Sequence, residues 1–157
     1  MKLRPFSEHA RGVFVSVDGP SGAGKSTIVH HLAQLLVATV ISDRYIPSGL
    51  VMQRFDGIDP VFLWRLNAEV DRPDLAVILE ADPEVISERL VERGPHNRFQ
   101  LSPGSSHAEV HFYRQATERL IQAGFDVLKV DCNQGPPEQS AAFIRDCLMT
   151  FFTSSTE

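Results

Sequence analysis

The feature that most constrains this chain is a glycine-rich loop placed between an apolar segment and an amphipathic one. Residues 13–18 (VFVSVD) are β-branched and apolar, which predicts a buried strand. The loop GPSGAGKS follows at 19–26, and from Lys25 onward apolar residues recur at helical spacing. A strand, this loop and a helix in that order are the context in which the pattern G-x-x-x-x-G-K-[ST] binds phosphate. A glycine-rich turn without a ligand is the alternative interpretation.

The residue types in this loop match the chemistry of a bound phosphate. Glycines let the backbone bend and turn its N–H groups toward an anion, where side chains would block the approach. Lys25 would place a charge at the β- and γ-phosphates of a nucleotide, and the Ser26 hydroxyl can ligate Mg²⁺. The following helix points its positive N-terminus at the same phosphates. The expected phosphate-binding residues are Gly19, Ser21, Gly22, Ala23, Gly24, Lys25, Ser26 and Thr27.

Apolar strands alternate with helices along the rest of the chain. Further strands are expected at 40–43 (VISD), 75–80 (LAVILE) and 125–130 (FDVLKV). Helices are expected from Pro60 to about Val70, from Pro83 to near Gly94, over about 107–123, and after Pro137. This alternation predicts an α/β three-layer sandwich of the P-loop NTPase type, with a parallel sheet. We expect one domain over residues 1–157, with its ordered core at about 12–153.

Composition excludes several classes of protein. The apolar fraction is 43% and the charged fraction 22%, as in an ordinary soluble domain. No apolar run is long enough to cross a bilayer, and the first residues lack the apolar stretch of a signal peptide. A net charge of −5 argues against a general nucleic-acid binder. Cys132 and Cys147 form neither a disulfide framework nor a metal-binding spacing, so reduced thiols in the cytoplasm are expected.

A carboxylate and an arginine follow the second expected strand. Asp43 ends this strand, at the edge where open parallel sheets present ligand-binding groups. A carboxylate there can hold Mg²⁺ through water opposite the phosphate loop, so Ser26 and Asp43 are the candidate metal ligands. Arg44 comes next and suits the phosphate of an acceptor. A surface Asp–Arg pair without a ligand is the alternative interpretation.

Three arginines gather at the end of one expected helix and in the loop after it. Arg89 and Arg93 lie four residues apart, a spacing at which like charges disfavour a helix. Arg98 follows in the segment 94–106, which is rich in loop-forming residues and is expected to be a mobile lid. Such arginines could neutralise charge on a transferring phosphoryl group, and a closing lid would exclude water. A solvated basic surface is the alternative interpretation.

The connection between the first helix and the second strand has no typical turn residue. Between Gln34 and Ser42 the chain contains no Gly, Pro, Asn or Asp. A reversal from helix to strand normally uses one of these residues. Either a compact turn passes through Ala38 and Thr39, or a connecting segment is missing near residues 38–41.

Three segments carry a resemblance to a known family. DRYIPSGLVMQ at 43–53 is similar to a D-R-[YFH] segment, with Ser48 and Gln53 at matching places. Residues 73–94 resemble the next strand and an arginine-bearing helix, and NRFQ at 97–100 resembles a D-R-x-E lid element. The segments that they resemble are typical of nucleoside monophosphate kinases, and the likeness is greatest to the thymidylate kinase family. It covers most of residues 13–148.

The resemblance implies an ATP-dependent kinase that transfers the γ-phosphoryl group to a nucleoside monophosphate, with a dTMP-like acceptor. The loop would hold ATP with Mg²⁺, and Arg89, Arg93 and Arg98 would serve the ATP phosphates from the lid. The implied acceptor-binding residues are Asp43, Arg44, Tyr45, Ser48 and Gln53. The implied catalytic residues are Lys25, Arg44, Arg93 and Arg98. Small-molecule nucleotides would be the partners, without nucleic acid or membrane, and family members commonly form homodimers.

The chain also departs from the family pattern. A strand and two helices that the family has before its D-R-Y segment are missing, at the connection that lacks a turn residue. Ser21 stands where the family commonly has an acidic residue, and this loop resembles that of cytidylate kinase. Met52 replaces a tyrosine and Arg54 a glycine. Two alternatives therefore stay open: a kinase for a nucleoside or another small metabolite, or a nucleotide-binding module without phosphotransfer.

Overall fold

The computed structural model of the protein describes residues 12–36, 39–94, 100 and 102–153. These residues form a parallel sheet with the strand order β2-β1-β3-β4. The strands are β1 (Val13–Asp18), β2 (Thr39–Asp43), β3 (Leu75–Glu80) and β4 (Val127–Asp131). The helices are α1 (Lys25–Leu35), α2 (Ile46–Phe55), α3 (Pro60–Leu66), α4 (Pro83–Arg93), α5 (Ser105–Gln122) and α6 (Pro137–Thr153).

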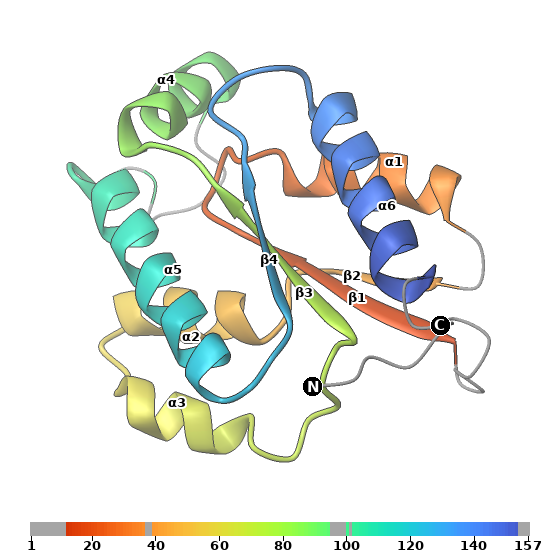
Figure 1. The fold of residues 1–157 in the computed structure, drawn as a ribbon. Coiled ribbons are helices and arrows are strands. Elements are labelled where there is room, and N and C mark those ends of the chain that lie inside the picture. The colour runs from red at the N-terminus through yellow and green to blue at the C-terminus, as the bar shows by residue number, and fades with distance from the viewer. Residues whose placement is uncertain (1–11, 37–38, 95–99, 101, 154–157) are drawn as a thin grey trace.

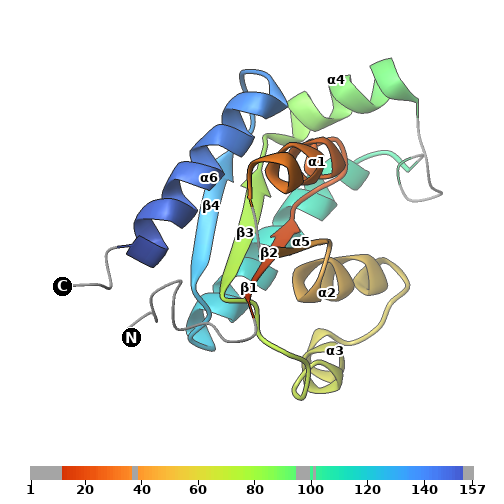
Figure 2. The ribbon, with the colours of Figure 1, turned by 90° about the vertical axis from the view of Figure 1, so that its right-hand side faces the viewer.

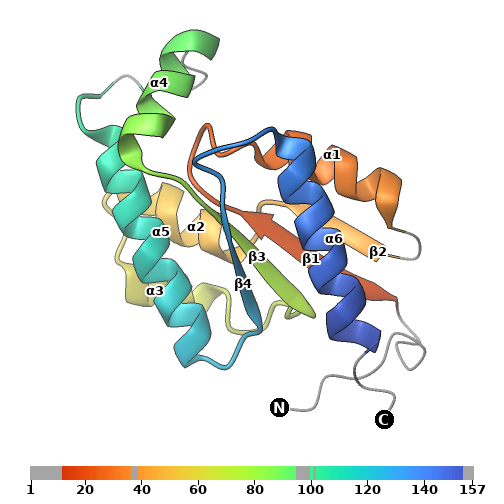
Figure 3. The ribbon, with the colours of Figure 1, turned by 45° about the horizontal axis from the view of Figure 1, so that its top comes forward.

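Helices cover both faces of the sheet (Figures 1 and 2). α1 and α6 pack together on one face, and α2 and α5 pack together on the other, with α3 beside α2. α4 follows β3 closely and lies beyond the carboxyl ends of the strands (Figure 3). The expected α/β three-layer arrangement is therefore confirmed.

The main hydrophobic core lies between the sheet and the α1–α6 layer. Ile28 and Leu32 are four residues apart on α1, so both side chains face the strands. Burying each such side chain contributes about 1.5–3 kcal/mol. The core includes Val13, Val15, Val17, Leu75, Val77 and Leu79 from the strands, with Ile28, Leu32, Ile144 and Leu148 from the helices. A second cluster joins α2, α3 and α5 and comprises Ile46, Leu50, Val51, Leu63, Tyr113 and Ala116.

The helix α2, which runs through the D-R-Y segment, is not predicted by the sequence patterns. No side chain at its own N-terminus caps it. Instead the carboxylate of Asp18, at the end of β1, accepts hydrogen bonds from the N–H groups of Tyr45 at 2.9 Å and Ser48 at 3.1 Å. This long-range cap fixes the start of α2 against the loop-bearing strand.

The helix α3 begins where predicted and ends early. The Asp59 carboxylate caps it by accepting hydrogen bonds from two backbone N–H groups, at 2.7 and 3.0 Å. The helix ends at Leu66 rather than near Val70. Asn67 closes it, because its side-chain amide donates to the Leu63 carbonyl at 2.8 Å.

The connection between α1 and β2 is short. α1 ends at Leu35, and Thr39 already pairs with β1. Thr39 therefore belongs to the strand, so the compact turn that was one of the two alternatives does not include Thr39. Ala38 lies outside the described residues. β2 is an edge strand of the sheet, and Val40 is 61% exposed. The missing segment near residues 38–41 stays a prediction.

The expected lid at 94–106 is described only in part. Residues 95–99 and 101 lie outside the described residues, and Arg98 is among them. α5 begins at Ser105, so the last two residues of the expected loop are helical. The rest of the lid hypothesis stays a prediction.

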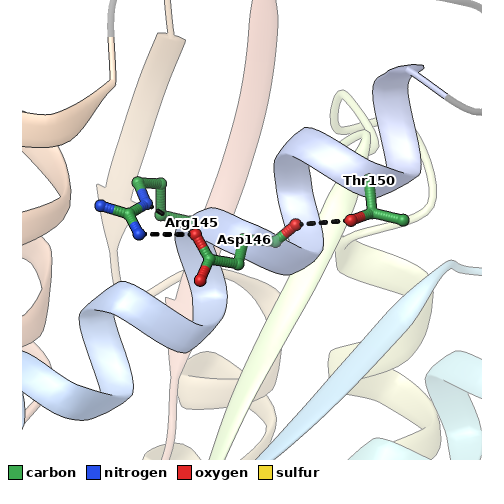
Figure 4. A network of polar contacts seen from close by, with 3 residues as sticks. All are labelled: Arg145, Asp146 and Thr150. Carbon is green, nitrogen blue, oxygen red and sulfur yellow. Dashed lines mark hydrogen bonds and ion pairs between the residues drawn. The ribbon is translucent and has the colours of Figure 1, made fainter.

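The exposed side of α6 carries a small polar network (Figure 4). Nη2 of Arg145 donates to the Asp146 carboxylate at 2.6 Å, and the Thr150 hydroxyl donates to the Asp146 carbonyl at 2.9 Å. Exposed ion pairs of this kind add little to stability. Neither α6 nor any other helix of the described residues is long and apolar enough to span a bilayer.

Candidate active site

The loop between β1 and α1 has a backbone that requires glycine at two points. A Cβ at Gly19 would lie 2.6 Å from the Leu79 carbonyl oxygen of β3. Gly24 precedes α1 with φ 88° and ψ 15°, a left-handed conformation that glycine adopts freely. No side chain caps α1, and its first turn contains no acidic residue, so its N–H groups can serve an anion. The other predicted residues of this site, Ser21, Gly22, Ala23, Lys25, Ser26 and Thr27, lie in the loop or in the first turn of α1.

Lys25 is buried at the start of α1, with 5% of its surface exposed. Its ammonium group donates a hydrogen bond of 2.8 Å to the Pro20 carbonyl. Burial, and then the charge of Arg44, lower the Lys25 pKa to about 8, and three nearby carboxylates oppose this shift. An anion in the loop would favour the charged form of Lys25. The side chain thus lies where a phosphate would stabilise it.

The structure brings the two candidate metal ligands into contact. The Ser26 hydroxyl, in the first turn of α1, donates a hydrogen bond of 2.6 Å to the Asp43 carboxylate at the end of β2. Both side chains are exposed to solvent. Within the described residues, no group of three or more His, Cys, Asp or Glu could hold a metal ion. Among the described residues, a site here would therefore rest on the Ser26 hydroxyl and the Asp43 carboxylate.

Arg44 has an unusual backbone conformation. Its φ is 76°, in the left-handed region, which costs a residue with a side chain about 1–2 kcal/mol. Two contacts hold this conformation: the Arg44 N–H donates to the Val17 carbonyl at 3.0 Å, and the Ser42 hydroxyl donates to the Arg44 carbonyl at 2.8 Å. The side chain is exposed, and its charge acts on Lys25. Strained residues of this kind concentrate at functional sites.

Ser48 takes part in a buried hydrogen-bond network behind the loop. Its hydroxyl donates to the Asp18 carboxylate at 2.6 Å and shares a hydrogen bond of 2.9 Å with the Tyr113 hydroxyl. Burial is the largest cause that raises the Asp18 pKa, and its Oδ2 is buried without a hydrogen-bond partner. Ser48, a predicted acceptor-binding residue, thus holds α2 against β1 through its hydrogen bonds to Asp18.

The other residues predicted from the D-R-Y segment lie on or beside α2. The Tyr45 ring packs edge-on against Phe14, with ring centroids 5.1 Å apart, and its hydroxyl donates to the Asp71 carbonyl at 2.8 Å. Gln53 is exposed in the second half of α2. Their contacts with an acceptor stay predictions.

The three predicted arginines differ in their surroundings. Arg89 is half-buried and donates to the Gly22 carbonyl of the loop at 3.4 Å and to the Asn133 carbonyl at 3.3 Å. It therefore connects α4 to the phosphate loop. Arg93 is exposed in the last turn of α4, and Arg98 lies outside the described residues.

Glu109 is a residue of the site that sequence reasoning missed. It lies on α5 and is 5% exposed. Its Oε1 accepts hydrogen bonds from the Ser21 N–H at 2.9 Å and from the Ser21 hydroxyl at 3.0 Å. A signal was present in the sequence, because Glu109 lies at helical spacing with Tyr113 and Ala116 on the buried side of α5. A glutamate on an apolar helix face needs a partner, and here the partner is the loop.

The sheet, the loop and the residues around it define an α/β protein of the P-loop class. The model of the thymidylate kinase family matches residues 37–125, more than half of the chain. The chain therefore belongs to the thymidylate kinase family, as its sequence motifs indicated.

Two curated relatives illustrate this membership. The chain is 33% identical over 103 residues to a probable thymidylate kinase of Pyrobaculum aerophilum, a match that covers 65% of this chain and 50% of the relative. It is 34% identical over 83 residues to the thymidylate kinase of Xylella fastidiosa strain 9a5c, covering 48% of this chain and 40% of the relative. In both comparisons the match spans half or less of the relative's length.

Solved structures share the fold at low sequence identity. Deoxyadenosine kinase from M. mycoides with bound dCTP superimposes with a TM-score of 0.70 at 13% identity, covering 88% of this chain and all of that chain (100%). The YorR protein from Bacillus subtilis, in complex with phosphorylated GDP, gives a TM-score of 0.63 at 18% identity, covering 88% and 96%. These likenesses support the P-loop α/β fold.

Proposed function

We propose that the chain is an ATP-dependent phosphotransferase that moves the γ-phosphoryl group of ATP to the phosphate of a nucleoside monophosphate. The observation that carries this proposal is the convergence of the phosphate loop, Lys25, the Ser26–Asp43 pair and Arg44 at the carboxyl ends of β1 and β2. A cradle of N–H groups beside two cationic side chains suits a donor and an acceptor that are both anionic.

In the proposed reaction an oxygen of the acceptor phosphate attacks the γ-phosphorus, the bond to the β–γ bridging oxygen breaks, and ADP leaves. Lys25 would keep its hydrogen bond to the Pro20 carbonyl and donate its other two N–H groups to oxygens of the β- and γ-phosphates. Arg44 would bind the acceptor phosphate, and Arg89, Arg93 and Arg98 would neutralise charge from α4 and the lid. The attacking phosphate is already anionic, so the site needs no strong general base.

Mg²⁺ is the proposed cofactor beside ATP. Ser26 and Asp43 fit this ion, because hydroxyl and carboxylate oxygens are ligands that it prefers, and it usually takes its remaining ligands from phosphates and water. Bound there, Mg²⁺ would neutralise charge on the phosphates. The Ser26–Asp43 hydrogen bond already keeps the two ligands within reach of a single ion.

A dTMP-like acceptor is the substrate that family membership supports. Tyr45, Ser48 and Gln53 would form or support the acceptor side of the site from α2. The short α1–β2 connection favours two other candidates. One is a kinase with a nucleoside or another small metabolite as acceptor. The other is a nucleotide-binding module without transfer. A cytoplasmic location and a homodimer stay predictions of this proposal.

An assay of ADP formation tests the proposal. The purified protein is incubated with ATP and Mg²⁺ and, separately, with dTMP, dUMP, CMP or thymidine. We expect ADP to form fastest with dTMP, and Lys25→Ala to abolish the reaction. Faster reaction with thymidine than with dTMP would favour a nucleoside kinase. ATP binding without ADP formation across the whole panel would favour the module without transfer.

A further inference from the structure

A single peptide unit of the loop connects Glu109 with Lys25. The carbonyl oxygen of this unit belongs to Pro20 and accepts a hydrogen bond of 2.8 Å from the Lys25 ammonium. The N–H of the same unit belongs to Ser21 and donates a hydrogen bond of 2.9 Å to Glu109 Oε1. A carboxylate and an ammonium group therefore bind opposite ends of one peptide dipole.

This arrangement is buried, so its charges depend on one another. The exposed fraction is 5% for Glu109 and for Lys25, and 3% for Ser21. Charges taken out of water are costly unless hydrogen bonds or opposite charges compensate them. In such surroundings a chain of hydrogen bonds polarises its members and strengthens each bond. A carboxylate on the Ser21 N–H can therefore strengthen the hydrogen bond that the Pro20 carbonyl accepts from Lys25.

Other charged groups near Lys25 have different partners. Asp18 caps α2, Asp43 accepts from Ser26, and Arg44 carries the same charge as Lys25. Of the carboxylates near Lys25, Glu109 is therefore the one that hydrogen-bonds to the peptide unit that Lys25 also binds. We propose that Glu109 is a positioning residue that, through the Pro20–Ser21 peptide, holds the Lys25 ammonium in place for the β- and γ-phosphates; this role rests on the proposed function.

A double-mutant cycle on nucleotide binding tests this role. Glu109→Gln keeps the shape and one acceptor oxygen but removes the charge, whereas Glu109→Asp keeps the charge. We expect Glu109→Gln to raise the dissociation constant of ATP about tenfold, as the loss of one charge-assisted hydrogen bond does. Glu109→Asp should restore part of the affinity. Glu118→Gln, at an exposed position of the same helix, should leave the affinity unchanged.

The decisive comparison is the same substitution without the lysine. In a Lys25→Ala background, Glu109→Gln should cause no further loss of ATP affinity, because its effect passes through Lys25. An equal loss in both backgrounds, or no loss in either, overturns the proposal. Calorimetry measures ATP affinity and does not require phosphotransfer. A wild-type protein that binds ATP but transfers no phosphate would thus refute the proposed function while the cycle still tests Glu109.

A groove between α2, α3 and α5 carries a second, independent inference. It has a volume of about 260 Å³ and lies in the helix layer formed by these elements. Its apolar wall consists of Leu50, Pro60, Val61, Trp64 and Ala116. Neither the loop residues nor the predicted acceptor-binding residues Asp43, Arg44, Tyr45, Ser48 and Gln53 line it, so it is distinct from the candidate active site.

Two arginines give this groove a positive charge. The Arg54 guanidinium lies 4.0 Å from the centroid of the Phe112 ring, and that of Arg119 lies 5.0 Å from the Trp64 ring. Arg54 also donates to the Gln115 amide oxygen at 2.6 Å. Within the described part of the chain, neither guanidinium is paired with a carboxylate, although the whole chain has a net charge of −5.

The combination of an apolar wall and unpaired guanidinium groups on aromatic rings is complementary to one class of ligand. An aromatic ring can occupy the apolar wall, while an acidic group on that ring pairs with the guanidinium groups. We propose that this groove binds a small aromatic acid. The volume of the groove suits a molecule of one or two rings better than a folded partner.

Fluorescence tests this site, because Trp64 is the single tryptophan of the chain. The probe is 8-anilinonaphthalene-1-sulfonate, with excess ATP present to occupy the phosphate loop. We expect the probe to quench Trp64, and Arg54→Ala with Arg119→Ala to weaken its binding about tenfold. Arg145→Ala, on α6, should have no effect.

An uncharged analogue of the probe supplies the matched control. N-phenyl-1-naphthylamine has the same rings without the sulfonate. It should bind more weakly, and the arginine substitutions should leave its affinity unchanged. Equal binding of both probes, or unchanged binding of the sulfonate to the double variant, overturns the proposal. A dimer in solution that shields Trp64 from both probes overturns it as well, because a second copy would then occupy the groove.

Discussion

The hydroxyl of Ser26 donates a hydrogen bond of 2.6 Å to the carboxylate of Asp43, and this contact joins the first turn of α1 to the carboxyl end of β2. The two residues are 17 positions apart in the sequence, and the parallel pairing of β1 with β2 brings them together. Each was a candidate metal ligand on separate sequence arguments. If both side chains ligate Mg²⁺ as proposed, this contact shows that one ion could bind the two of them.

Replacement of Asp43 by Asn tests the metal role of this pair. The amide keeps the shape but loses the charge that holds Mg²⁺ in place. We expect phosphotransfer to need about tenfold more Mg²⁺ for half-maximal rate, measured as ADP formation over a Mg²⁺ titration. The same titration with Asp146→Asn, on α6, serves as the control. An unchanged Mg²⁺ requirement in Asp43→Asn would show that the carboxylate is not a metal ligand.

Gly19 and Gly49 provide a matched pair of substitutions. A Cβ at Gly19 meets the Leu79 backbone at 2.6 Å, and its φ of 151° disfavours a side chain. We therefore expect Gly19→Ala to cost about 1–3 kcal/mol of stability and to weaken ATP binding. A Cβ at Gly49, inside α2, meets nothing within 4 Å, so Gly49→Ala should stabilise the protein by about 0.5–1 kcal/mol.

Urea unfolding and ATP calorimetry on both variants check this prediction. Equal stability of the two variants would contradict the close approach of the loop to β3. Normal ATP affinity in Gly19→Ala would contradict the role of the loop backbone.

The parts of the fold that depend on local sequence could be predicted. β1 and β3 have the predicted bounds, because continuous apolar runs define buried strands. The start of α3 could also be predicted, because Asp59 stands directly before a proline. β4 begins two positions later than expected, at Val127. α2 could not be predicted, because Asp18 caps it from another strand and local patterns do not reveal such a contact.

The candidate site shows the same division. The phosphate-loop residues could be predicted from the motif alone. Asp43 and Arg44 lie beside the loop because β2 pairs with β1 in the sheet. Glu109 was missed because its partner, Ser21, is 88 positions away and only packing of α5 against the loop brings them together. The network role of Ser48 was missed for a similar reason, since it depends on Tyr113 of α5.

The buried Asp18 predicts a dependence of stability on pH. Burial raises the pKa of its carboxyl group in the folded state above the ordinary value of 3.8. Its favourable contribution is therefore complete below the unfolded pKa and is lost as pH rises through the folded pKa. Asp18→Asn keeps an acceptor oxygen and stays neutral. We expect the free energy of unfolding of Asp18→Asn, relative to wild type, to increase as the pH rises above about 4.

Urea denaturation at several pH values measures this difference. A constant difference between variant and wild type across the range would show that the carboxyl group does not titrate differently on folding.

Because the backbone of Arg44 is strained, one substitution there should raise stability and weaken activity. Glycine adopts a φ of 76° without the cost that a side chain imposes, so Arg44→Gly should gain about 1 kcal/mol of stability. The same change removes the guanidinium proposed to bind the acceptor, and the KM for dTMP should rise about tenfold or more. Thermal unfolding and initial rates check the two effects. A variant that is more stable and keeps its KM would remove Arg44 from the acceptor site.

Phosphorus NMR of the purified protein with ATP, Mg²⁺ and dTMP tests the central claim most directly, because it identifies every phosphate that is made. The account predicts that the γ-phosphate signal of ATP declines while the signals of ADP and dTDP grow in equal amounts, and that Lys25→Ala shows no change. Growth of inorganic phosphate without dTDP, or spectra that stay constant with the wild-type protein, would contradict it.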